Sequence, residues 1–164
     1  NGILFNHESP IRGETFVTKK IIQGLIRIKN DNQKKLFLGN LYSKRDWGHA
    51  GDYVEAMWKM LQQKKPNDYV IATGKTFTIK EFVNKSANKI GLKIKWVGKG
   101  IKEKAINLKN GKVLIECKNR YFRPVEVDYL KGNAQRAKKI LKWKPKISID
   151  TLIDEMIKHE ENLS

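Results

Sequence analysis

The chain has 164 residues, of which 40% are hydrophobic, and its formal net charge is +17. This length suits one domain with a sizeable core, and no apolar run approaches the roughly 20 residues of a membrane-spanning helix. The single cysteine, Cys117, excludes an internal disulfide framework and cannot make a zinc site, which needs about four ligands. We therefore expect a cytoplasmic protein with no metal site, no membrane partner and an inert thiol.

The large positive charge is a pattern typical of nucleic-acid-binding proteins, because clustered cations release counterions from phosphate backbones. Only 6 of the 34 basic residues are arginine, however, the residue that binds phosphate and guanine in a bidentate manner. Most lysines fall where a helix or turn would face water, as in Lys64-Lys65 and Lys138-Lys139. We expect a solvated basic surface without a nucleic-acid partner, and keep a basic nucleic-acid-binding module as the alternative from another class.

The first half of the chain is predicted to alternate strands with helices. Gly2 to Asn6 has the apolar pattern of a buried strand, so we expect the chain to begin inside a folded element, as a fragment would. Thr15 to Ile28 has helical spacing, and Lys35 to Leu38 is a short strand that the turn pair Gly39-Asn40 closes. The buried face of the first helix is predicted to hold Ile21, Ile22, Leu25 and Ile28.

A polar loop from Leu41 to Gly51 leads into a second helix, for which Asp52 is predicted as the N-cap. Within this loop, Asp46 is expected to orient Arg45, and His49 is expected to help shape the loop. The helix ends before Pro66. Its spaced apolar residues are Val54, Met57, Trp58 and Leu61. The tryptophans predicted to be packing anchors are Trp47, Trp58 and Trp143.

The second half of the chain continues this alternation. Tyr69 to Ala72 is predicted as a buried strand, and Thr78 to Glu81 has the form of a capping box that opens a helix ending at Gly91. Strands are predicted at Ile94 to Val97 and Val113 to Ile115, and between them the Lys- and Gly-rich stretch Gly98 to Lys112 is expected to be a mobile surface loop. Two further helices are predicted, from about Asn133 to Leu141 and after Asp150. The pattern indicates an α/β architecture with parallel pairing, with too few long strands for a free-standing doubly wound sheet.

Motifs for cofactor or metal chemistry do not occur in this sequence. No Gly-x-Gly-x-x-Gly follows a strand, and there is no Gly-x-x-x-x-Gly-Lys-Ser/Thr loop or His-Glu-x-x-His pair. None of the five tyrosines has a lysine four residues later, which excludes the acid–base pair in which an ammonium lowers the pKa of a phenol. We therefore expect no catalytic residue within this chain.

Polar and cationic residues follow the predicted strands, where open α/β sheets usually bind ligands. Asn6 and His7 can hydrogen-bond a ligand, and Arg12 can reach a phosphate. A lysine in the first turns of the first helix adds its charge to the positive end of the helix dipole. The segment Tyr121 to Glu126 pairs a guanidinium, suited to pyrophosphate, with a carboxylate, suited to sugar hydroxyls. Together with the loop that follows Leu38, these groups outline a site for a dianionic nucleotide-sugar.

Five segments resemble successive segments of GDP-mannose 4,6-dehydratases, a family of the extended short-chain dehydrogenase/reductase superfamily. They are FNHESPIRG, FVTKKI, LGNLYSKRDWGHAGDYVEAMW, YVIATG and YFRPVEVDYLKGNAQRAKKILKWKP. The first and third segments distinguish this family from others in the superfamily, whereas the last contains patterns that recur in related sugar-nucleotide enzymes. The resemblance is weakest over Gly98 to Asn119. The sequence also departs from the family pattern at Ile11, where many relatives have a second arginine beside Arg12.

The resemblance implies the C-terminal part of an NAD(P)-binding Rossmann-type enzyme with a small α/β substrate-binding domain. Its last Rossmann strands, at about residues 1–6 and 68–74, would be interleaved with a nucleotide-sugar-binding subdomain, and the N-terminal cofactor and catalytic half would be missing. Such enzymes hold NADP tightly, oxidise C4 of GDP-mannose, eliminate water across C5 and C6, and return the hydride to C6. They assemble as dimers or tetramers. Their catalytic Thr, Glu and Tyr-x-x-x-Lys lie upstream of Asn1, so the resemblance implies no turnover by this chain alone.

The family pattern also implies roles for individual residues. His7 and Arg12 would contact NADP. The residues that would line the GDP-sugar site are Asn6, Val17, Lys20, Gly39, Arg45, Arg123 and Glu126. A sister epimerase or reductase on the same scaffold remains an alternative, because the residues that choose among these reactions are absent from the chain.

Overall fold

Short strands alternate with helices in the computed structural model, which describes residues 1–122, 125 and 127–163. The α-helices of this part are α1 (Val17–Lys29), α2 (Ala50–Leu61), α3 (Ile79–Lys89) and α4 (Ile149–Glu161). The strands are β1 (Gly2–Leu4), β2 (Asn6–Glu8), β3 (Leu36–Leu38), β4 (Lys44–Arg45), β5 (Trp47–His49), β6 (Tyr69–Ile71), β7 (Phe77–Thr78), β8 (Ile94–Val97), β9 (Lys104–Asn107), β10 (Val113–Cys117) and β11 (Tyr129–Leu130). Short helical segments are η1 (Gly100–Lys102), η2 (Asn119–Tyr121) and the π-helical η3 (Ala137–Leu141).

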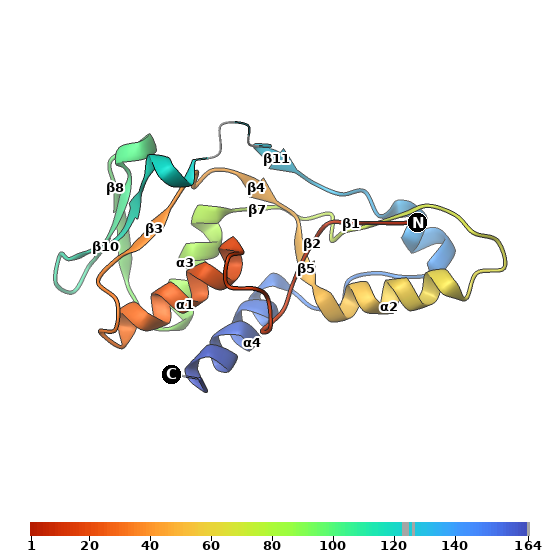
Figure 1. Cartoon of the computed structure of the whole chain (residues 1–164), viewed down its shortest axis with the longest axis horizontal. Coiled ribbons are helices and arrows are strands. Elements are labelled where there is room, and N and C mark those ends of the chain that lie inside the picture. The colour runs from red at the N-terminus through yellow and green to blue at the C-terminus, as the bar shows by residue number, and fades with distance from the viewer. Residues whose placement is uncertain (123–124, 126, 164) are drawn as a thin grey trace.

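The strands form several small sheets. β1 pairs with β6 and β2 pairs with β5, both in parallel, and β4 lies between β11 and β7. The largest sheet has the order β3-β10-β9-β8, in which β10 is parallel to β3 and antiparallel to β9. Figure 1 shows this sheet at one end of the molecule, and β1 and α2 at the other. The predicted mixed α/β architecture with parallel pairs is therefore observed.

The larger core lies between the four-stranded sheet and helices α1, α3 and α4. On α1, the predicted face is buried, with Ile21 fully enclosed and Ile28 the most exposed of the four at 8%. Each such side chain contributes about 1.5–3 kcal/mol when it is fully buried. A buried ion pair between Lys19 and Glu160 joins α1 to α4, and the Lys19 ammonium also donates to the Pro10 carbonyl at 2.6 Å. These contacts fix the start of α1, which matters for the site below.

The stretch Gly98 to Lys112 is not the mobile surface loop that its composition predicts. It contains η1 and the strand β9, which is an inner strand of the largest sheet. Ala105 on β9 is fully buried, and the buried carboxylate of Glu103 accepts hydrogen bonds from Tyr42 at 2.7 Å and Lys80 at 2.6 Å. Pairing with β8 and β10 outweighs the loop-like composition, and Lys104, the one lysine of β9, is exposed to solvent.

The apolar stripe predicted for α2 is largely exposed. Val54 and Trp58 are 60% and 61% exposed and Leu61 is 82% exposed, so Trp58 is not a packing anchor here. The predicted buried strand at Gly2 to Asn6 divides into β1 and β2, and Ile3 on β1 is 55% exposed. In the described residues β1 pairs with β6 alone. A smaller core beneath α2 contains Tyr53, Ala56, Tyr69, Ile71, Ala137, Leu141 and Trp143.

The helix caps confirm the sequence prediction for α3 and correct it for α2, and the start of α4 also differs from the prediction. Thr78 and Glu81 form the predicted capping box of α3. His49, not Asp52, caps α2, since its Nδ1 accepts from the Gly51 amide at 3.0 Å. Asp52 is buried and instead accepts from the backbone N–H groups of Lys146 and Ile147 at 2.9 and 3.0 Å. Likewise, α4 begins at Ile149 with Ser148 as its cap.

The carboxylate of Asp46, which is fully buried between β4 and β5, connects three chain segments. One oxygen accepts from the Thr73 amide at 2.8 Å and from its hydroxyl at 2.6 Å. The other accepts from the amides of Gly74 at 2.9 Å and Gly132 at 3.1 Å. The predicted role of Asp46 as a partner of Arg45 is thus replaced by a structural one, because both of its oxygens bind these loops.

Replacing Asp46 by alanine is expected to lower the free energy of unfolding by about 3 kcal/mol or more. The change leaves three backbone N–H groups without their acceptor, and each buried unpaired group costs about 1–3 kcal/mol. Urea unfolding of the two proteins measures the difference. The matched control is Asp154→Ala, because that exposed carboxylate makes only a surface ion pair with Lys89, worth about 0–1 kcal/mol. Equal losses in both variants would contradict the structural role of Asp46.

Candidate functional site

A pocket of about 600 Å³ opens where α1 begins and where β3 and β10 end. Five of the predicted GDP-sugar residues line it, and they come from β2, α1, β4 and the loop after β3. These five are Asn6, Val17, Lys20, Gly39 and Arg45. Asn40 and Tyr121 also line it, and they belong to the two loops that the sequence analysis placed at the site without giving either residue a role of its own. Sequence reasoning did not assign the other lining residues to the site: Thr15, Phe16, Leu38, Ile79 and Arg120.

The pocket has a positive potential. Its described lining contains the cations Lys20, Arg45 and Arg120 and no carboxylate. The N-terminus of α1 also faces it, and Phe16 at the N-cap position provides no side-chain hydrogen bond to the first turn. Free N–H groups and the helix dipole at such an end favour a phosphate or another anion. The geometry therefore suits a ligand with adjacent negative charges.

Lys20 is half-buried in this pocket, and its surroundings affect its proton affinity. Burial lowers the pKa of Lys20 below the ordinary lysine value, and the nearby positive charge of Arg120 lowers that pKa further. Its ammonium nitrogen lies 3.7 Å from the centre of the Tyr121 ring. A bound anion would offset both effects, because it favours the protonated form of the lysine.

The two predicted cofactor residues lie outside this pocket's described lining. His7 has its Nδ1 2.9 Å from the Phe5 carbonyl oxygen, and its ring packs against Tyr53 in a tilted arrangement with 5.1 Å between the ring centres. If Nδ1 carries the proton of neutral His7, Nε2 can accept a hydrogen bond. The guanidinium of Arg12 lies 3.4 Å above the ring of Phe16.

Arg12 is also tied to the carboxylate of Glu8. Its Nε lies 3.1 Å from the Glu8 Oε2, and the Thr18 hydroxyl donates to the same oxygen at 2.7 Å. Burial raises the pKa of Glu8, and the hydrogen bond from Thr18 and the charge of Arg12 oppose that rise. Arg12 thus holds the loop after β2 against the start of α1. Two other predicted site residues, Arg123 and Glu126, lie outside the described residues.

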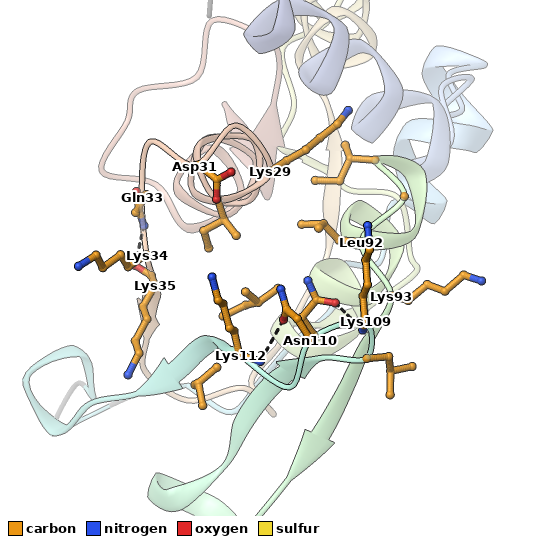
Figure 2. A pocket seen from close by; sticks show the side chains of 17 residues that line it. Lys29, Asp31, Gln33, Lys34, Lys35, Leu92, Lys93, Lys109, Asn110 and Lys112 are labelled. Atoms are coloured by element: carbon orange, nitrogen blue, oxygen red, sulfur yellow. Dashed lines mark hydrogen bonds between the residues drawn. The ribbon is translucent and has the colours of Figure 1, made fainter.

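A larger hollow of about 1290 Å³ contains none of the predicted site residues. Figure 2 shows that Lys112 extends into it, whereas Lys34 points away. The C-terminal ends of α1 and α3 border this hollow, together with Asp31. Because helix C-termini carry partial negative charge, lysines there offset the helix dipoles. The smaller pocket is therefore the candidate functional site.

Comparison with known proteins gives the family of this chain. The family model described as GDP-mannose 4,6 dehydratase matches residues 1–156. The chain belongs to this family. It is 54% identical to GDP-mannose 4,6 dehydratase of Dictyostelium discoideum, over 96% of this chain and 44% of that protein. It is 50% identical to the human GDP-mannose 4,6 dehydratase, over 96% of this chain and 42% of that protein. The chain thus spans less than half the length of these curated relatives.

Solved structures share the fold at low sequence identity. RMD from Pseudomonas aeruginosa, complexed with NADPH, superposes with a TM-score of 0.78 at 19% identity, over 99% of this chain and 48% of that one. The dTDP-glucose 4,6-dehydratase of Bacillus anthracis, in complex with NAD, superposes with a TM-score of 0.74 at 18% identity. The match covers 98% of this chain and 44% of that one. These likenesses confirm the predicted extended short-chain dehydrogenase fold class for this GDP-mannose 4,6-dehydratase family member.

Two further observations concern other kinds of site. No helix in residues 1–122 or 127–163 has the length and apolarity needed to cross a bilayer. Within the same described ranges, no three His, Cys, Asp or Glu side chains gather into a group that could hold a metal ion. Burial raises the pKa of the Cys117 thiol, and Glu103 adds to this rise, which disfavours the reactive thiolate.

The affinity of the pocket for inorganic pyrophosphate is expected to fall with rising pH, starting below the ordinary lysine pKa of 10.5. Binding needs the ammonium of Lys20, so its contribution is fully present below the lowered pKa and is lost as the pH rises through it. Calorimetric titrations at several pH values between about 7 and 10 measure this change. Lys20→Gln should bind more weakly and lack this component of the pH dependence. Identical profiles would exclude Lys20 as a ligand.

Proposed function

We propose that the whole protein to which this chain belongs is a GDP-mannose 4,6-dehydratase, a hydro-lyase that converts GDP-mannose to GDP-4-dehydro-6-deoxy-D-mannose. The chain would supply the nucleotide-sugar site and part of the cofactor site. One observation carries the proposal: five residues with family-implied roles in GDP-sugar binding, distant in sequence, line one pocket. Membership of the family and identities near 50% to enzymes with this name add support.

The pocket's chemistry supports a nucleoside diphosphate sugar. The diphosphate would lie at the N-terminus of α1 between Lys20 and Arg45, where cations and free N–H groups meet. The side-chain amides of Asn6 and Asn40 line the same pocket and can bind hydroxyl groups. We place Arg123 at the diphosphate and Glu126 at sugar or ribose hydroxyls, following the family pattern.

We further propose NADP as the cofactor, with His7 and Arg12 as its contacts in this chain. A solved neighbour contains NADPH and another contains NAD. The residues fit such a role, since His7 has a ring nitrogen beyond its contact with Phe5, and Arg12 keeps its two terminal nitrogens beyond the Nε that faces Glu8. The cofactor would accept a hydride from the sugar and return it. The loop held by Glu8 would keep Arg12 in place.

The exposed apolar residues support a second part of the proposal. We infer that β1 and β6 are the last strands of a Rossmann sheet, interleaved with the nucleotide-sugar-binding subdomain that contains the larger core. Polypeptide equivalent to the remaining length of the relatives would cover Ile3 on β1 and the stripe of α2 that contains Trp58 and Leu61. Burying these side chains would remove a large apolar patch from water. We also propose a homo-oligomer, a dimer or tetramer, as the working form.

A sister reaction on the same scaffold is the nearest rival. A UDP-glucose 4-epimerase of Thermotoga maritima shares the fold with a TM-score of 0.72. Its identity of 16% is far below the 50% identity to the human dehydratase. The family match therefore favours the dehydratase, and product analysis separates the two reactions.

The complete enzyme is expected to consume GDP-mannose without an added reductant and to form GDP-4-dehydro-6-deoxy-D-mannose. No net oxidant or reductant is needed, because the hydride taken from C4 returns to C6. Nuclear magnetic resonance of the product checks the structure of the sugar. A C2 or C4 epimer, or a requirement for stoichiometric NADPH, would refute the dehydratase assignment and favour the rival.

Replacing Arg123 by alanine is expected to weaken GDP binding by about tenfold or more, because a charge-assisted bond to phosphate is worth about 1.5–3 kcal/mol. Calorimetric titration of GDP into the complete enzyme measures the change. Arg27→Ala is a matched control, since Arg27 is exposed on α1 and is not part of the pocket lining. Unchanged affinity in Arg123→Ala would refute the placement of the diphosphate.

A further inference from the structure

We propose that the turn η2 is an additional ligand-binding wall of the nucleotide-sugar site. Arg120 would bind the diphosphate as a further guanidinium, and Tyr121 would act as a positioning residue that holds the ammonium of Lys20. This inference rests on the proposed function and extends it to Arg120, which the sequence analysis did not place at the site, and to Tyr121, which it placed in a site loop without a role of its own. The evidence is the path of the chain, the charge of the pocket and the contacts of Lys20.

The sheet brings η2 to the pocket. β10 runs parallel to β3, with Cys117 opposite Leu38, so the two strands end at the same edge. The Lys118 amide then donates to the Leu38 carbonyl at 2.9 Å. Within the turn, the amide of Tyr121 donates to the Lys118 carbonyl at 3.0 Å. The turn is therefore tied to the end of β3, next to the start of α1.

Gly39 allows η2 to lie this close. A Cβ atom at Gly39 would lie only 2.1 Å from the backbone carbonyl oxygen of Tyr121 and 2.7 Å from its carbonyl carbon. Backbone atoms cannot move aside as a flexible side chain would, so any other residue at this position would displace the turn. This gives Gly39 a structural reason for its place in the site: it admits Arg120 and Tyr121 to the pocket wall.

Arg120 has the chemistry of a phosphate ligand. Its side chain lines the same pocket as Lys20 and Arg45. Arg120 also lies near enough to Lys20 for its charge to lower the proton affinity of that lysine. The charges of Lys20 and Arg120 repel each other in this pocket, and an anion with two adjacent phosphates relieves this repulsion. A guanidinium on a flexible side chain can bind such a group in a bidentate manner.

The Lys20 ammonium lies over the aromatic ring of Tyr121. The ring centre lies 3.7 Å from the ammonium nitrogen, and the Arg120 guanidinium lies 5.3 Å from the same centre. The electron-rich face of an aromatic ring attracts a cation but does not neutralise it as a carboxylate would. Lys20 is thus held in one direction while its charge stays available to a ligand.

The test measures binding of GDP and guanosine to the complete enzyme carrying Arg120→Ala. The dissociation constant for GDP should rise about tenfold or more, whereas that for guanosine, which lacks phosphates, should change less than about twofold. Arg27→Ala removes the same charge outside the pocket and should leave both constants unchanged. Arg120→Lys should recover part of the GDP affinity. Equal GDP affinity in Arg120→Ala and the parent, or an equal loss for guanosine, would overturn the role of Arg120.

A double-mutant cycle tests Tyr121. Tyr121→Phe keeps the ring and should bind GDP like the parent, whereas Tyr121→Leu removes it and should bind about three- to tenfold more weakly. If Tyr121 acts through Lys20, the loss caused by Tyr121→Leu should disappear in the Lys20→Ala background. Additive losses, or a loss in Tyr121→Phe equal to that in Tyr121→Leu, would overturn the positioning role.

Different results would contradict the proposed function and the inference about η2. If the parent enzyme does not bind GDP or turn over GDP-mannose, the proposed function fails, and η2 loses its assigned ligand with it. If the parent does both and the Arg120 and Tyr121 variants match it in GDP affinity and in KM, only the inference about η2 fails. Thermal unfolding at the same temperature in parent and variants shows that a loss of affinity is not a loss of fold.

Discussion

The buried carboxylate of Asp46 is the constraint on which the arrangement of this chain most depends. It lies between β4, which belongs to the sheet with β7 and β11, and β5, which pairs with β2. Its hydrogen bonds hold the loop after β6 and the segment at Gly132. Gly132 is packed so tightly that a Cβ there would lie 2.1 Å from the Cβ of Ala72. One side chain thus sets the relation between the β1–β6 pair and the strand that carries Arg45.

The site itself is an electrostatic arrangement that this scaffold maintains. Folding places Lys20, Arg45 and Arg120 around one pocket at the positive end of α1, where the charges of Lys20 and Arg120 repel each other. Buried contacts nearby offset that repulsion, including the ion pair of Lys19 with Glu160, the hydrogen bond that Glu8 accepts from Thr18 and the ion pair of Glu8 with Arg12. Carboxylates therefore act next to the pocket rather than in its described lining. Such an arrangement favours an anionic ligand with little reorganisation.

Charge alone was a poor guide to function in this protein. The many lysines that raise the net charge to +17 are spread over helices and turns, and several make surface ion pairs, such as Lys85 with Asp150 and Lys89 with Asp154. The larger hollow has several lysines in its lining, yet two helix C-termini border it. By contrast, the smaller pocket collects two of the six arginines. The residue type and the helix end that faces it identify the site better than the number of positive charges.

The sequence by itself determined the features that depend on local spacing. The buried stripe of α1 and the capping box at Thr78 involve residues a few positions apart, so periodicity and capping chemistry predict them. The family motifs likewise name five of the residues that line the pocket. Only the tertiary structure decided the rest, including β9 as an inner strand, Asp46 as a link between loops and η2 as a pocket wall. The hydrogen-bond partners of Asp46 lie 27 to 86 residues away in the sequence, and the position of η2 depends on a close backbone approach at Gly39. No local sequence pattern encodes contacts over such separations.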